Sequence, residues 1–171
     1  MLQTELIASP PWGNEQDWTD LAARAAKAAI TASSHGDLLS RDFAIEVSVK
    51  LSDNAEVQSL NKAYRGKDKP TNVLSFPQIQ PDLLETLENS DDGEALLGDI
   101  ILAYETCCDE AAAKKISIST HVSHLIVHGS LHLLGYDHEN EVDAGVMENC
   151  EINALATLGI ANPYAEQAQS R

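Results

Sequence analysis

The chain has 171 residues, of which 43% are hydrophobic, and its formal net charge is −16. A chain of this length fits one domain that buries roughly 70% of its unfolded surface, so neither a disulfide nor a metal is needed merely for folding. No apolar run reaches the ~18–20 residues that cross a bilayer, and residues 1–18 lack the basic and apolar regions of a signal peptide. We therefore expect a cytoplasmic protein without a membrane segment.

The net charge argues against the broad basic surface that nucleic-acid-binding proteins usually carry. The basic residues are nevertheless concentrated in one place. Four of the eleven fall within eight positions: Lys62, Arg65, Lys67 and Lys69. The sequence thus describes an acidic protein with one basic segment.

The three cysteines are Cys107, Cys108 and Cys150. Their number is odd and no two are spaced as a CxxC pair, which argues against a disulfide framework and against a thiolate zinc site. Free cysteines are usually buried, so we expect these residues to be partly buried thiols.

The N-terminal part of the chain alternates between strand and helix patterns. Residues 3–8 alternate weakly in polarity and predict a short strand, and residues 15–33 place alanine and other apolar residues at helical spacing. Residues 43–50 alternate between apolar and polar side chains, as in a half-buried strand.

A second helix follows directly after that strand. Asp53 and Glu56 resemble a capping box, and they predict a helix that runs to about Tyr64. Its apolar face is expected to consist of Val57, Leu60 and Tyr64.

Two more strands precede a helical C-terminal part. Residues 71–76, between two prolines, predict one strand, and residues 97–104 predict the other. The acidic residues 78–95 between them are expected to form a mobile loop. Three helices are then expected, over residues 105–115, 119–134 and 140–158.

This order of elements predicts an α/β (α+β) fold. We expect residues 1–171 to form a single compact domain, in which helices pack on a small mixed sheet.

The most informative segment is an apolar helix that carries His124, His128 and His132, each four residues from the next. Residues i and i+4 share one helix face, so His128 and His132 can bind one metal ion from a single helix. Gly135 can adopt a positive φ that ends the helix and turns the chain back, which brings His138 toward the same point. Three imidazoles with one open position form a catalytic type of zinc site, so we predict one Zn²⁺ ion on His128, His132 and His138.

The ligand spacing, H-x3-H-x5-H with a glycine three residues before the last histidine, matches the frame of the metzincin proteases. Those proteases carry their glutamate general base directly after the first histidine, where this chain has Gly129. A peptidase would lack its base here, so we discount protease activity.

The neighbouring polar residues have less specific interpretations. His124 is expected to be an outer contact of the site or a neighbour on the helix face, and not a fourth ligand. Asp137 either orients a ligand from outside or is only a turn residue. His121 and His35 are expected on the surface.

The segment from His128 to His138, HGSLHLLGYDH, is similar to the signature of the YbeY family, bacterial zinc-dependent endoribonucleases of ribosomal RNA maturation. The resemblance covers most of residues 45–164. It includes four further blocks: Leu60-Asn61, Tyr64 to Pro77 (YRGKDKPTNVLSFP), Leu97 to Ile100 (LGDI), and Leu158-Gly159 with Asn162-Pro163-Tyr164.

The resemblance implies that His128, His132 and His138 bind zinc and that Arg65 is functionally important, with Arg65 and His128 as the candidate catalytic residues. It also implies cleavage of single-stranded RNA, maturation of the 16S ribosomal RNA 3′ end and ribosome quality control. RNA and the ribosome or small-subunit proteins would then be partners. The oligomeric state is left open.

The residues of these blocks are compatible with RNA hydrolysis. Zinc can lower the pKa of bound water to ~7 or polarise a phosphoryl oxygen, and the planar guanidinium of Arg65 suits a phosphate. Lys67 and Lys69 can add positive charge that stabilises the transition state. Asn72 and Ser75 lie on a strand that could border the site. The sequence offers no evident strong general base.

Three functions remain open at this point. The first is a metal-dependent endoribonuclease, and the second is a ribosome-associated assembly factor with a structural zinc and little catalysis. The third is a zinc hydrolase of another substrate class, such as a peptidase, against which Gly129 argues.

Overall fold

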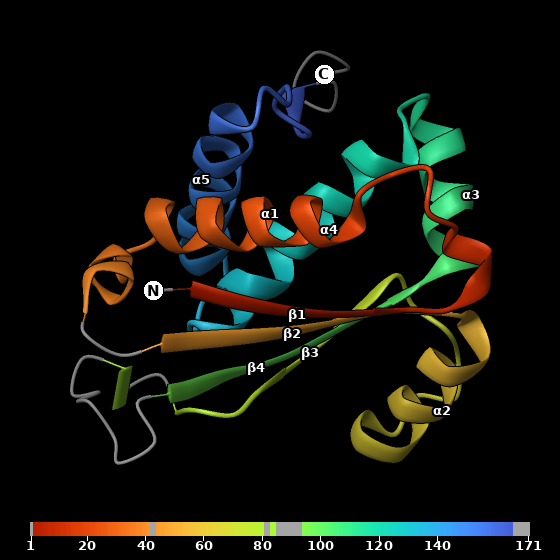
Figure 1. Ribbon diagram of the computed structural model, residues 1–171, viewed down its shortest axis with the longest axis horizontal. Helices are drawn as coiled ribbons and strands as arrows, with labels where there is room; N and C mark the ends of the chain where they lie inside the picture. The colour runs from red at the N-terminus through yellow and green to blue at the C-terminus, as the bar shows by residue number, and fades with distance from the viewer. Residues whose placement is uncertain (1, 42–43, 81–82, 85–93, 166–171) are drawn as a thin grey trace.

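One four-stranded sheet organises the protein, and its strand order is β1-β2-β4-β3 (Figure 1). The first three strands in this order run parallel, and β3 pairs antiparallel with β4 at one edge. The strands are β1 (Leu2–Ala8), β2 (Ala44–Ser52), β3 (Val73–Pro77) and β4 (Glu94–Ala103). The computed structural model describes four parts of the chain: residues 2–41, 44–80, 83–84 and 94–165.

Helices cover both faces of this sheet unequally (Figure 1). Within the described residues, the α-helices are α1 (Trp18–Ala32), α2 (Asn54–Arg65), α3 (Tyr104–Lys114), α4 (Ile118–Leu133) and α5 (Glu141–Thr157). Short 3-10 turns occur at Pro10–Trp12 and Gly36–Ser40. Helices α1, α4 and α5 lie on one face, and α2 packs against β3 and β4 from the other. None of these helices is long and apolar enough to cross a bilayer.

The core lies between the sheet and the layer of α1, α4 and α5. Strand β2 shows why: its residues Ile45, Val47 and Val49 are buried under the helices, while the side chains between them point to the opposite face. Helix α4 is the central helix of this layer, since it contacts α1, α3, α5, β3 and β4. A functional group on α4 is therefore held by a rigid, well-packed element.

The observed elements confirm the predicted α/β fold with a small mixed sheet packed against helices. The predicted cap of α2 is also present, because the Asp53 carboxylate accepts a hydrogen bond from the backbone N–H of Glu56 at 2.8 Å. The predicted mobile loop over residues 78–95 falls largely outside the described residues.

The predicted buried face of α2 is wrong at one position. Val57 is buried and Leu60 is half-buried, but Tyr64 is 72% exposed. The polar side chain of Asn61 is buried instead, at 2% exposure. Its side-chain amide donates a hydrogen bond to the carbonyl oxygen of Lys69 in the segment that follows the helix, a contact that the hydrophobic pattern does not reveal.

The cysteines are free thiols, as predicted. Burial, together with the nearby Glu110 carboxylate, raises the pKa of Cys107 to about 12, whereas Cys108 and Cys150 are partly exposed. Because the thiolate is the reactive form, we expect iodoacetamide at about pH 8 to alkylate Cys108 and Cys150 well before Cys107. Peptide mass spectrometry measures the order, with urea-unfolded protein as the control in which all three react. Early labelling of Cys107 in the folded protein would contradict the burial described here.

Candidate metal centre

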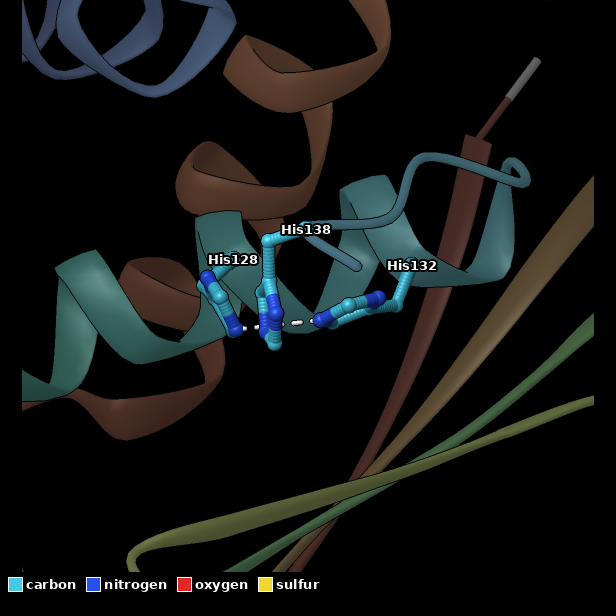
Figure 2. Close-up of side chains that lie close together, drawn as sticks. All are labelled: His128, His132 and His138. Carbon is cyan, nitrogen blue, oxygen red and sulfur yellow. Dashed lines mark hydrogen bonds between the residues drawn. The ribbon is translucent and has the colours of Figure 1, made fainter. Parts of the chain in front are cut away.

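Helix α4 presents two of the predicted ligands from one face. Its first turn is capped by Ser117, whose hydroxyl accepts a hydrogen bond from the backbone N–H of Thr120 at 3.1 Å. His128 and His132 lie one turn apart near its end, and their Nε2 atoms are 3.1 Å from each other (Figure 2). The i, i+4 spacing therefore brings both rings to one point, as the sequence predicts.

The third histidine reaches this point from the turn after the helix. Gly135 adopts a φ of 96°, which reverses the chain as predicted. The ring of His138 then stacks on that of His128, with centroids 5.6 Å apart, and meets that of His132 in a T-shaped arrangement, with centroids 5.1 Å apart. Figure 2 shows the three rings converging from α4 and from the turn.

The three histidines fit a metal ion. Each offers one ring nitrogen, and these atoms all lie within 4.8 Å of one another. Tetrahedral zinc with Zn–N bonds of about 2.0–2.1 Å places its ligand nitrogens about 3.4 Å apart. The 3.1 Å separation on α4 is already near that value, so small side-chain movements suffice to complete the set.

Each helical ligand is oriented by an acceptor at its other ring nitrogen. Nδ1 of His128 contacts a carboxylate oxygen of Glu151, and Nδ1 of His132 is 2.9 Å from the carbonyl oxygen of Tyr136. When Nδ1–H donates to these acceptors, Nε2 carries the lone pair that a metal needs. Burial, with the nearby His128, also lowers the pKa of His132 to about 4, so this ring is neutral at neutral pH.

The buried carboxylate of Glu151 was not found by the sequence reasoning. This side chain on α5 is 1% exposed, and it accepts hydrogen bonds from His124, His128 and the Tyr164 hydroxyl. Burial raises its pKa, but these three hydrogen bonds outweigh burial and lower the pKa to about 2. Glu151 therefore remains ionised beside the ligand cluster.

A sequence signal for Glu151 did exist. The buried residues of α5 recur at helical spacing, and Glu151 lies between Met147 and Leu155 on the same face. An acidic residue within an apolar stripe needs a buried partner, because an unpaired charge in the core is costly. That partner could have been sought among the histidines.

His124 and Asp137 both occupy positions that the sequence allowed. His124 points to Glu151, at 3.3 Å, and is not part of the converging cluster. The Asp137 carboxylate accepts a hydrogen bond from the backbone N–H of His138 at 2.7 Å, which is the behaviour of a turn residue.

The expected surface position of His121 is wrong. Its side chain is 1% exposed, and its Nε2 lies 2.8 Å from the Glu110 carboxylate on α3. A partner from another helix makes this burial possible, and sequence spacing on α4 gives no sign of it. His35 is partly buried.

A cavity of about 690 Å³ joins the histidines to the basic segment. His128, His132 and His138 line one side of it. Among the other lining residues are three from the basic segment and two from β3 and its entry: Arg65, Lys67, Lys69, Asn72 and Ser75. The fold thus brings together the two most unusual parts of the sequence, which are 59 positions apart along the chain at their nearest residues, Lys69 and His128. The fourth basic residue, Lys62, is outside this lining and faces Asp68 at 3.8 Å.

The basic loop is held in place by the end of α2. Gly66 adopts a left-handed conformation with a φ of 69° and ends the helix directly after Arg65. The buried Asn61 side-chain amide donates to the carbonyl oxygen of Lys69 at 2.9 Å, and the backbone carbonyl of Asn61 accepts from the backbone N–H of Lys67 at 3.2 Å. These contacts fix the backbone from which the three basic side chains reach the cavity.

The structure also explains why a glutamate is missing after the first ligand. A Cβ atom at Gly129 would lie 3.0 Å from Cγ2 of Ile100 and 3.0 Å from Oγ of Ser75. Helix α4 therefore packs against β3 and β4 at this position without room for a long side chain.

The chain is similar to known proteins over most of its length. A family model described as endoribonuclease YbeY matches residues 12–159. A protein of that name from Sphingopyxis alaskensis is 56% identical over 98% of this chain and 99% of the relative, and one from Rhizorhabdus wittichii is 53% identical over 96% and 98%. The solution structure of a Thermotoga maritima protein has the same fold, with a TM-score of 0.54 and 20% identity over 92% of each chain. The chain belongs to the endoribonuclease YbeY family.

Proposed function

We propose that this protein is a zinc-dependent endoribonuclease that cleaves single-stranded ribosomal RNA in the cytoplasm. We further propose that it acts in maturation of the 16S ribosomal RNA 3′ end and in ribosome quality control. The observation that carries the proposal is the single cavity lined by three converging histidines and three basic side chains. Its relatives, which are named endoribonucleases, support the same reaction class.

The residues of the cavity have two roles: the histidines would hold a metal ion, and the basic side chains would hold a phosphate. His128, His132 and His138 would hold the zinc ion, which when bound polarises a phosphoryl oxygen and acidifies water beside it. The guanidinium of Arg65 matches a phosphodiester in a two-point hydrogen bond. It would stabilise the negative charge that grows on the phosphate during cleavage.

The two lysines have a more general role in this proposal. Lys67 and Lys69 line the same cavity and would neutralise the phosphate backbone on either side of the cut. The rest of the chain is strongly acidic, so its surface repels RNA elsewhere. RNA would therefore be held in this cavity, with the ribosome or small-subunit proteins positioning it.

The experiment that tests the function measures metal content and RNA cleavage together. We expect about one zinc per chain and cleavage of labelled single-stranded RNA by the wild type, and the loss of both in His128→Ala, because that variant removes a ligand. His35→Ala is the matched control, since it deletes a histidine outside the cavity lining and should keep both properties. Equal cleavage by wild type and His128→Ala would assign the activity to a contaminant.

The RNA ends that form identify the attacking group. Products that end in a 2′,3′-cyclic phosphate require attack by the neighbouring 2′-hydroxyl of the RNA. Products without a cyclic phosphate at early times require attack by water. Mass spectrometry of a short synthetic RNA after brief digestion distinguishes the two routes.

The net charge of −16 favours one alternative function, a ribosome-associated assembly factor with a structural zinc. That function predicts ribosome binding without RNA turnover, and unfolding when a chelator removes the metal. A peptidase has less support, because Gly129 stands where the general base of a protease of this frame would be.

A further inference from the structure

We propose that Tyr164 is a positioning residue of the metal centre, which acts through Glu151 to hold the ligand His128 in its metal-binding orientation. This inference rests on the proposed zinc site. It assigns to the C-terminal turn a part in metal binding, although that turn supplies none of the three ligands.

Glu151 connects the turn to the ligand through its two carboxylate oxygens. Oε1 contacts Nδ1 of His128. Oε2 accepts from the Tyr164 hydroxyl and lies 3.3 Å from Nε2 of His124. The orientation of the His128 ring therefore depends on the orientation of one buried carboxylate, and two donors fix the far side of that carboxylate.

The local structure aims Tyr164 at this carboxylate. After α5 the chain turns at Asn162, whose side-chain oxygen accepts from the backbone N–H of Tyr164 at 2.8 Å. The Tyr164 and His124 rings meet in a T-shaped arrangement, with centroids 5.9 Å apart and planes at 90°. Burial and the hydrogen bond to Glu151 raise the pKa of Tyr164, so its hydroxyl is a proton donor at neutral pH.

Removal of the hydroxyl would leave Oε2 with the longer contact to His124 alone. A buried carboxylate oxygen that loses a donor is energetically unfavourable, so the carboxylate rotates toward the donors that remain. This rotation moves the acceptor oxygen that holds His128. Outer partners of metal-bound histidines commonly account for about 10–100-fold in metal affinity.

The test measures the affinity for Zn²⁺ alone, by competition with a chromophoric chelator, in the full-length protein without RNA. We expect Glu151→Gln to weaken zinc binding about 10–100-fold, and Tyr164→Phe to weaken it in the same direction by up to about tenfold. The double variant should bind as weakly as Glu151→Gln alone, because the two residues act in series. The visible spectrum of the Co²⁺-loaded protein should change in both single variants, since it reports the geometry at the metal.

The chain offers matched controls for both substitutions. Glu110→Gln removes a carboxylate that holds His121 on the same helix, outside the ligand cluster, and Tyr104→Phe deletes a hydroxyl outside the metal cavity. Both controls should bind zinc like the wild type. The Tm of each metal-free variant separates a change in folding from a change at the metal.

The outcomes are distinct. Wild-type zinc affinity and Co²⁺ spectrum in Tyr164→Phe would overturn the inference, as would a lowered Tm with unchanged zinc affinity or additive effects in the double variant. If Glu151→Gln fails to fold, Tyr164→Phe decides alone. A wild type that binds no zinc would overturn the proposed zinc site and this inference together. Wild-type binding with unaffected variants would overturn the positioning role alone.

Discussion

Arg65→Ala is expected to lower kcat for RNA cleavage about 10²–10³-fold while zinc content and Tm stay at their wild-type values. The side chain is exposed at the end of α2 and lines the cavity, but it is not among the converging ligands. Loss of one donor to a charge that develops in the transition state typically has an effect of this size. An exposed side chain outside the core contributes little to folding. Single-turnover cleavage of a labelled RNA, with metal analysis and thermal unfolding, measures all three quantities.

Two further variants separate the contribution of charge from that of geometry. Arg65→Lys keeps the positive charge but loses the planar two-point donor, so its rate should fall between those of the wild type and Arg65→Ala. Arg24→Ala removes an arginine from the surface of α1, where it pairs with Asp20, and should leave cleavage unchanged. Undiminished cleavage by Arg65→Ala would exclude Arg65 from the reaction. Loss of zinc in the same variant would make its role structural.

The parts of the fold that were predictable are those that depend on local patterns. Period-two alternation identified β2, and helical spacing identified α1 and α4, because the buried face of each element leaves its period in the sequence. The convergence of the three candidate ligands was predictable for the same reason. His128 and His132 are one helical turn apart, and Gly135 is the residue that a reversal of the chain requires.

The parts that were missed depend on contacts between distant elements. His121 was expected on the surface, and its burial depends on Glu110 from another helix. The contact between Glu151 and His128 spans 23 positions and two helices. A polar side chain is buried only where such a partner exists, and no periodic pattern identifies the partner.

The pairing of the basic segment with the histidines has an intermediate status. Neither charge nor spacing in the sequence placed Arg65 near His128, and only the family resemblance linked them. The fold supplies the physical link, because α2 ends beside β3, and β3 packs under α4. Two segments with separate chemistry thus line the same cavity.

Gly129→Glu is expected to lower the free energy of unfolding by more than about 3 kcal/mol, a large part of the ~5–15 kcal/mol that stabilises a typical domain. A Cβ at this position already meets Ile100 and Ser75 at 3.0 Å. The longer side chain would overpack the contact between α4 and the sheet, which commonly has a destabilising effect of about 1–3 kcal/mol. Its carboxylate would in addition lose water in the core, at a further energetic disadvantage. Urea unfolding followed by circular dichroism measures the change.

Two alanine variants test whether lack of space is the cause. Gly145→Ala on α5 places a Cβ in open space, so the better helix propensity of alanine should stabilise the protein by about 0.5–1 kcal/mol. Gly129→Ala has the same gain in helix propensity, but the close contacts oppose that gain. The variant should therefore be stabilised less than Gly145→Ala, or be destabilised.

A Gly129→Glu variant as stable as the wild type would show that α4 can move away from the sheet. If such a variant also cleaved peptides, the lack of a glutamate general base would be the sole reason why this chain is not a peptidase like the proteases with the same histidine spacing. The close packing of α4 on β3 and β4 argues for the opposite outcome, since the position that carries the base in those proteases is occupied here by the contact between helix and sheet.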